Sequence, residues 1–327
     1  MERPRSDLRS DEAWLDEAAA WIREVAAEAD LHLHGRIEVH RHRVWATTLI
    51  AHSHRGTLWF KANCPAFAFE PALVHLLTEI APDAVTAPVA IDPRRGWMLH
   101  LDGGPALGDH HEPTTDDWAQ IVQQMGSLQC ALGGHRERLL ATGLPDCAPT
   151  TVAHRFDDLV ETYASTPPAH PSHLSPEMYA DLLRQRPRVI DAAQQLGSFA
   201  VSAALQHGDL HPWNVFAATD SRGRHRVFDF GDAQWASPFE VLAVPFGWIA
   251  PSESAAWLPV LHAYREVWSD LIGPRDFDAL FNATHVTHPI NRAATWRAAL
   301  ATASPDSWGT WGSQPADHLR NLLEDRG

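Results

Sequence analysis

The stretch QHGDLHPWNVFAATDSRGRHRVFDFGDA, residues 206–233, decides our interpretation of the fold. In it, Asn214 follows Asp209 by five positions, and Asp229 opens a DFG triplet after a hairpin turn predicted at 220–223. Phosphoryl transfer needs one carboxylate at the acceptor hydroxyl, and an amide oxygen and a second carboxylate to hold magnesium against the phosphates. A DFG triplet alone is a weak signal, but an HxDLxxxN loop followed by DFG is much more specific. The order of these residues therefore predicts a site for phosphoryl transfer.

The motif His207 to Asn214, followed by Asp229 to Asp232, resembles the aminoglycoside phosphotransferase family. That family, with choline and fructosamine kinases, shares the bilobal fold of protein kinases. The resemblance implies an α+β fold with a small N-terminal lobe on an antiparallel sheet and a larger, mainly helical C-terminal lobe. It also implies that Asp209 is the catalytic base and that Asn214 and Asp229 bind Mg²⁺, while His207 braces the loop. The competing interpretation makes Asp209 a turn residue and Asn214 a cap.

Hydrophobic periodicity divides the chain in agreement with this fold. Apolar residues at helical spacing predict a helix from Ser10, its N-cap, to Asp30. Two or three antiparallel strands are expected within 36–62, a helix at 70–80, and two further strands at 89–91 and 97–101. Helices are expected at 117–132 and 175–196, a short β region at 202–230, and helices again from 239. We therefore expect a nucleotide-binding lobe at 1–101 and a catalytic lobe at 102–327, joined near 97–104.

Lys61 is the only lysine of the chain, and it follows an apolar strand pattern. A kinase-like site needs such a lysine to bind the α- and β-phosphates, and a helix glutamate to hold it. Glu70, at the start of the next predicted helix, is the preferred partner of Lys61. Glu79 is the reserve, because the short gap from Lys61 to Glu70 counts against Glu70. Lys61 as an edge-strand charge that blocks aggregation, and Glu70 as a first-turn charge favoured by the helix dipole, remain alternatives.

The nucleotide base is expected at the joint between the lobes. By resemblance, the backbone of Met98, Leu99 and His100 would hydrogen-bond adenine, although Met98 and Leu99 are equally compatible with a core position. Residues 40–47 contain no glycine, so the glycine-rich loop of protein kinases is absent. This points away from protein kinases and leaves the covering of the triphosphate open, with Arg41 and Arg43 as candidates.

Acceptor contacts are expected on the helical lobe, facing Asp209. Indole rings suit the face of a sugar and carboxylates suit ammonium groups, so both kinds of side chain are candidates. Glu253 and Trp257, four apart, are expected to share a helix face. For any single tryptophan a core position remains the simpler explanation. The candidates are Asp232, Gln234, Trp235, Glu240, Glu253, Trp257, Trp296 and Trp308.

Composition narrows the possible partners and location. The formal net charge of -15 argues against nucleic acid and anionic membranes as partners. Three separated cysteines, no apolar signal segment and no run of about 18 apolar residues favour a cytoplasmic protein. The 21 histidines include pairs spaced two apart, but no recognised zinc-ligand spacing.

The sequence thus predicts a kinase that uses ATP or GTP with Mg²⁺ and phosphorylates a hydroxyl of a small, cationic molecule. An aminoglycoside or related antibiotic is the preferred acceptor. A metabolic kinase of an amino sugar such as glucosamine, and a nucleotide-binding pseudokinase scaffold, are the alternatives, with a zinc-binding histidine-rich protein a more distant one. The phosphorylated hydroxyl and the oligomeric state stay open.

Overall fold

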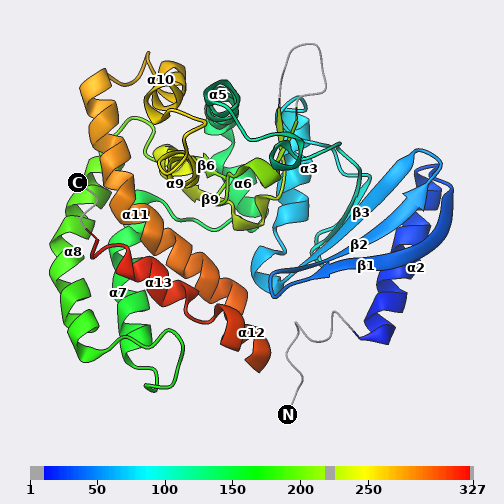
Figure 1. Ribbon diagram of the computed structural model, residues 1–327, viewed down its shortest axis with the longest axis horizontal. Coiled ribbons are helices and arrows are strands. Elements are labelled where there is room, and N and C mark those ends of the chain that lie inside the picture. Colours follow the sequence, from blue (N-terminus) through cyan, green and yellow to red (C-terminus); the bar gives the residue numbers. More distant parts are fainter. Residues whose placement is uncertain (1–10, 218–224, 325–327) are drawn as a thin grey trace.

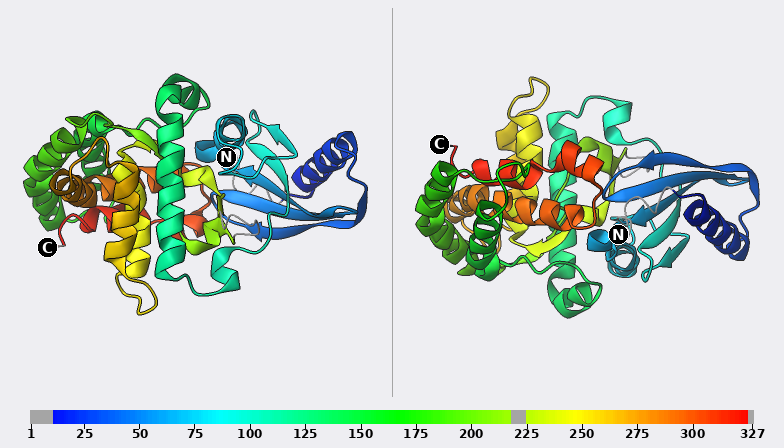
Figure 2. Two further views of the ribbon diagram at one scale, coloured as in Figure 1. Left: turned by 90° about the horizontal axis from the view of Figure 1, so that it is seen from above. Right: turned by 90° about the horizontal axis from the view of Figure 1, so that it is seen from below.

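The computed structural model describes residues 11–217 and 225–324. It has an antiparallel sheet in its N-terminal lobe and a mainly helical C-terminal lobe, which confirms the predicted fold class (Figure 1). The two lobes lie at opposite ends of the long axis when the molecule is seen from above and below (Figure 2). The predicted cap Ser10 and the predicted turn at 220–223 lie outside the described residues.

The N-terminal sheet has five strands in the order β1-β2-β3-β5-β4. Three of them fall within or next to the segment 36–62, where the sequence predicted two or three. Lys61 of β3 pairs with Met98 of β5, so the lysine lies in an inner strand of the sheet, not at its edge. The strands are β1 (Leu33–His42), β2 (Ala46–Ser53), β3 (Gly56–Asn63), β4 (Ala90–Asp92) and β5 (Trp97–Leu101).

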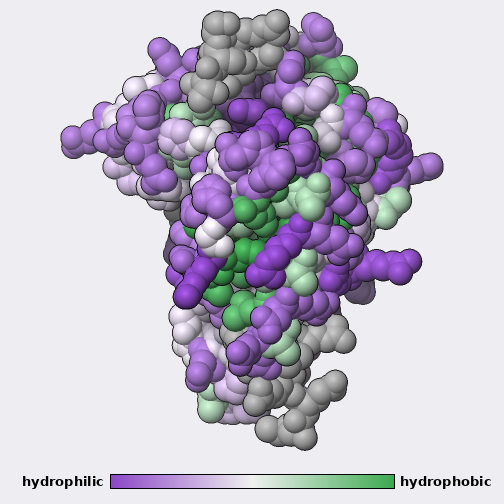
Figure 3. Space-filling model, turned by 90° about the vertical axis from the view of Figure 1, so that its right-hand side faces the viewer, coloured by the Kyte–Doolittle hydropathy of each residue, from purple (hydrophilic) through white to green (hydrophobic). Residues whose placement is uncertain are grey.

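Helix α2 (Glu12–Glu28) packs on one face of this sheet. Its Trp14 and Trp21 contact Phe60 and Trp97 at ring-centroid distances of 5.7–6.3 Å. Because side chains alternate along a strand, burying Phe60 on this face turns Lys61 to the other face. At this end of the molecule, hydrophobic residues are also visible between hydrophilic ones (Figure 3).

Helix α3 (Glu70–Ile80) follows β3 and begins with Glu70. The C-terminal lobe is built around α11, a helix whose buried residues run along most of its length. Within the described residues, no helix is both long and apolar enough to cross a membrane. The helices after α3 are α4 (Leu107–His110), α5 (Thr115–Leu132), α6 (Arg136–Ala141), α7 (Val152–Ala164), α8 (Pro176–Gly197), α9 (Ala243–Ile249), α10 (Trp257–Val267), α11 (Pro274–Leu300), α12 (Pro305–Trp311) and α13 (Gln314–Arg320).

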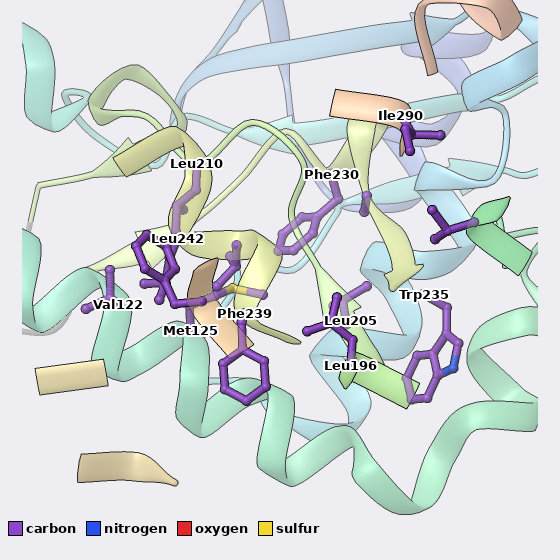
Figure 4. Packing of buried hydrophobic residues seen from close by; sticks show 14 of the residues in the cluster. Val122, Met125, Leu196, Leu205, Leu210, Phe230, Trp235, Phe239, Leu242 and Ile290 are labelled. Atoms are coloured by element: carbon purple, nitrogen blue, oxygen red, sulfur yellow. The ribbon is translucent and has the colours of Figure 1, made fainter. Parts of the chain in front are cut away.

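Two short antiparallel ribbons carry the motif residues. β6 (Ala204–Gln206) pairs with β9 (Gln234–Ala236), and β7 (Val215–Phe216) pairs with β8 (Arg226–Val227). Leu210 of the HxDLxxxN loop and Phe230 of the DFG triplet are both buried in the core of the C-terminal lobe, near Leu205 and Met125 (Figure 4). These apolar anchors fix the polar residues beside them, since a packed core tolerates little displacement.

Candidate active site

Lys61 forms two short ion pairs, and the one with Asp229 joins the two lobes. Its Nζ lies 2.6 Å from Glu70 Oε2 and 2.6 Å from Asp229 Oδ1. Burial alone would lower the pKa of Lys61, but the two carboxylates outweigh burial and raise it. Glu70 is fully buried, whereas Glu79 is half exposed and pairs with Arg138 at the surface. The preferred partner, Glu70, is therefore the one that contacts the lysine.

The loop that carries Asp209 is held by backbone geometry and by His207. Gly208 has a φ of 84°, and a Cβ there would lie 2.1 Å from the carbonyl oxygen of Asp232. The buried His207 ring donates from Nε2 to the Phe228 carbonyl oxygen at 3.0 Å and accepts at Nδ1 from the Asp209 N–H at 3.3 Å. Burial lowers the pKa of His207 to about 4, so the ring is neutral and acts as a brace.

The Asp209 carboxylate is about one-third exposed and faces two potential cations. His211 Nε2 lies 3.4 Å from Asp209 Oδ2. Burial alone would raise the pKa of Asp209, but the hydrogen bond from His211 and the positive charge of Arg292 outweigh it and lower the pKa to about 2. Asp209 is therefore ionised at every pH at which the protein is expected to work.

Asn214 and Asp229 present oxygen atoms beside Asp209. The Asn214 side-chain amide donates to the Asp209 carbonyl oxygen at 2.9 Å, which leaves its amide oxygen as the free end. Asp229 adopts a left-handed φ of 65°, and its Oδ2 accepts no hydrogen bond from the described residues. Hard oxygen donors of this kind match the preference of Mg²⁺, which keeps several waters and usually binds through few protein ligands. The donor set therefore fits magnesium.

A metal ion can also be held by a cluster of several His, Cys, Asp or Glu side chains. In 11–217 and 225–324, no group of three or more His, Cys, Asp or Glu side chains is arranged to hold a metal ion. An ion at Asn214 and Asp229 would therefore need water and phosphate oxygens to complete its coordination.

A cavity of about 580 Å³ adjoins Lys61 and Asp229. Its wall includes Met98 and His100 from β5 and continues through Leu101 to Pro105. Leu99 does not fit the predicted backbone contact with adenine. Its side chain is fully buried on the α2 face of the sheet, and its carbonyl oxygen accepts from the Val89 N–H. β4 pairs only with 97–99, so the edge of β5 that is left open toward the cavity begins after Leu99.

Three of the predicted acceptor contacts lie inside the protein or are already paired. Asp232 binds Arg292, with Oδ1 and Nη1 2.6 Å apart. Gln234 is buried and donates to Thr295, and Trp235 is buried in the core. The prediction for Gln234 and Trp235 was wrong in this respect, because both belong to β9, whose short strand is covered on both faces.

The predicted helix face shared by Glu253 and Trp257 is also wrong. Helix α10 begins at Trp257, and Glu253 lies in the preceding loop. Trp257 packs against Phe246 and Phe281, which makes it part of an aromatic cluster. The remaining candidates are occupied elsewhere: Glu240 is buried and bound by Thr287 and Asn291, Trp296 stacks with Trp311, and Trp308 contacts His170.

Sequence reasoning missed three residues at this site. Arg292 comes from α11 and contributes the buried cation near Asp209, which no local pattern indicated. Trp213 lies within the quoted motif and is 42% exposed, and Trp248 of α9 is 45% exposed. The sequence signal for Trp213 was its position, since a large apolar residue stands between Pro212 and Asn214 in a loop of polar residues.

Comparisons with known proteins bear on the fold. No protein-family model and no curated protein matches the chain. Among solved structures, a macrolide 2'-phosphotransferase type I is 16% identical with a TM-score of 0.60, over 94% of this chain and 98% of that chain. An ethanolamine kinase from Plasmodium vivax is 11% identical with a TM-score of 0.63, over 96% and 88%. A thermostable mutant of an aminoglycoside phosphotransferase is 11% identical with a TM-score of 0.55, over 88% and 94%.

These likenesses extend over nearly the whole of each chain at low sequence identity, so they show the fold. The chain has the fold of small-molecule phosphotransferases, which includes the aminoglycoside phosphotransferases that the motif resembled.

Proposed function

We propose that the protein is a magnesium-dependent phosphotransferase that moves the γ-phosphate of a nucleoside triphosphate to a hydroxyl of a small molecule. One observation carries this proposal: Lys61 and Asp229 line one cavity with Lys61 Nζ 2.6 Å from Asp229 Oδ1, and Asp209 lies near enough to Asp229 for their charges to interact. The fold shared with proteins named as a macrolide phosphotransferase and an ethanolamine kinase supports it.

Each residue has a role that its chemistry supports. Lys61, held by Glu70, binds the α- and β-phosphates, and Asp209 aligns the acceptor hydroxyl and takes its proton. A carboxylate with a pKa of about 2 is a weak base. This is sufficient, because the transition state of phosphoryl transfer is loose and positioning contributes more than proton removal.

Asn214 and Asp229 would hold the magnesium ion through the amide oxygen and the uncommitted Oδ2. The ion supplies positive charge that neutralises the triphosphate in this acidic crevice. Asp229 keeps its Oδ1 on Lys61 and so holds the lysine and the ion-binding oxygen in one orientation.

For the nucleotide base, we move the expected backbone contacts from Met98–His100 to Leu101 and Gly103, since the Asp102 N–H donates to the Thr57 carbonyl oxygen at 2.9 Å. Residues 97–99 are already paired with β4, while Leu101, Asp102 and Gly103 line the cavity beyond it. The proposal includes the division into a nucleotide-binding lobe at 1–101 and a catalytic lobe at 102–327. It includes ATP or GTP as the phosphate donor.

The acceptor that we favour is an antibiotic with hydroxyl groups, an aminoglycoside or a related compound. The three proteins compared above are named for macrolides, ethanolamine and aminoglycosides, so they do not favour the alternative of a metabolic amino-sugar kinase. A pseudokinase scaffold is disfavoured, because Lys61, Asp209, Asn214 and Asp229 are all present, Lys61 binds Asp229, and Asn214 binds the backbone of Asp209.

The test is ADP release with ATP or GTP and Mg²⁺ across four probes: erythromycin, kanamycin, choline and ethanolamine. We expect acceptor-dependent ADP release in the natural protein, and at least a hundredfold loss of kcat in Asp209→Asn with nucleotide binding retained. Asp116→Asn, an exposed acid in the first turn of α5, is the matched control. Acceptor-independent nucleotide binding without turnover on any probe would support the scaffold instead.

A further inference from the structure

Trp213 is an exposed side chain held in a fixed orientation. Its indole Nε1–H donates to Asp109 Oδ1 at 2.9 Å. Its ring lies against Gly108 of α4, where an added Cβ would come within 2.7 Å of the indole. Exposed side chains are usually free to change rotamer, so a hydrogen bond and a glycine contact that both orient one indole indicate a binding surface.

Trp248 and His211 extend this surface. The Trp213 and Trp248 rings lie 5.3 Å apart with an interplanar angle of 52°, and the His211 ring lies 6.1 and 6.2 Å from them. All fourteen tryptophans belong to the described part of the chain, and the two that are largely exposed are this pair. We call Trp213, Trp248 and His211 the aromatic shelf.

The aromatic shelf is continuous with the proposed catalytic centre. His211 contacts both tryptophans of the shelf, and its Nε2 lies 3.4 Å from Asp209 Oδ2. Trp213 precedes Asn214 directly in the chain. A molecule lying on the shelf therefore has part of its structure next to the atom that would receive the acceptor proton.

We propose that the aromatic shelf binds a sugar ring of a glycoside acceptor and orients one hydroxyl toward Asp209. This inference rests on the proposed function and names the specificity-determining residues, which the sequence candidates did not include. The indoles stack on the apolar C–H face of a saturated ring.

The arrangement of the rings favours a sugar over a small quaternary ammonium group. A cation is bound best by aromatic faces that surround it. Trp213 and Trp248 contact each other instead of enclosing a gap, since their ring centroids are 5.3 Å apart.

The test measures acceptor KM and nucleotide KM for Trp213→Ala, Trp248→Ala and the two corresponding Phe variants. Erythromycin and kanamycin are the glycoside probes, and choline and ethanolamine the sugar-free probes. We expect the protein to turn over a glycoside. Each Ala variant should raise the KM of that glycoside at least tenfold more than it raises the nucleotide KM. The Phe variants should raise the glycoside KM less. Leu258→Ala, which removes a 64% exposed side chain at the start of α10, is the matched control.

The outcomes separate the two proposals. Turnover of a glycoside with acceptor KM values within twofold of the natural protein in both Ala variants would overturn the aromatic shelf and leave the phosphotransferase assignment intact. Turnover of choline or ethanolamine alone would overturn the assignment to a sugar ring. The absence of turnover on all four probes would overturn the proposed function and the shelf together. Thermal unfolding of each variant identifies a loss that is due to misfolding, and the Trp248 variants, at an exposed position, keep the test decisive in that case.

Discussion

Replacing Lys61 by Met is expected to destabilise the protein as well as to inactivate it. The substitution keeps the length of the apolar stem but removes the ammonium group that binds Glu70 and Asp229. Asp229 is about one-third exposed and can be hydrated, whereas the Glu70 side chain is fully buried and would be left as an unpaired charge. The cost therefore arises mainly at Glu70.

The magnitude follows from the burial. Removing one partner of a buried ion pair costs about 3–5 kcal/mol. With an unfolding entropy of about 2.1 cal/mol/K per residue, a chain of this length loses roughly 4–7 °C in Tm for that cost if it unfolds in one transition. Burial already raises the pKa of Glu70, and losing Lys61 raises it further, so the folded variant binds a proton that the unfolded chain releases. The destabilisation should therefore be smaller at pH 5.5 than at pH 8.

The assay is thermal unfolding at both pH values for Lys61→Met, Glu70→Gln and the double variant, with nucleotide binding measured in parallel. The double variant should recover at least half of the lost Tm, because the buried charge of Glu70 is removed together with its partner, while nucleotide binding stays weak. Arg138→Met, which breaks the exposed pair with Glu79, is the control and should cost less than about 1 kcal/mol. A Tm for Lys61→Met within 1 °C of the natural protein at pH 8 would refute the reasoning.

Three further predictions concern the loop, the core and the ion. Gly208→Ala should lower kcat by about a hundredfold, because the φ of 84° at this position and a Cβ 2.1 Å from the Asp232 carbonyl oxygen would displace the loop. Gly133→Ala is the control, since a Cβ there meets no atom within 4 Å. Equal kcat values for the two variants would contradict this. Burial raises the pKa of Glu240 to about 7, above its unfolded value, so stability should fall by up to about 3 kcal/mol as pH rises from 5 to 8, and Glu240→Gln should flatten that slope in a Tm series. Chelating Mg²⁺ should weaken nucleotide binding by at least about tenfold in calorimetry, since Asp229 then repels the triphosphate; equal affinity with and without chelator would refute the role of the ion.

The residues that act within one local segment were predictable from the sequence. Asp209 and Asn214 share one tight loop, and Asp229 follows after a short ribbon, so their spacing alone limits how far apart they can lie. Lys61 was identified by its uniqueness and by the alternation of its strand, and the strand Trp97–Leu101 was predicted with its observed bounds. In each case the geometry of a single element restricts the positions of the side chains.

Contacts between distant segments were decided only when the lobes packed. Arg292 of α11 binds Asp232, and Trp248 of α9 meets Trp213, across segments that lie far apart in the sequence. Leu99 and Trp235 face the core rather than a ligand for the same reason. Alternation along a strand separates two faces but does not say which neighbour covers each face, since that depends on long-range packing.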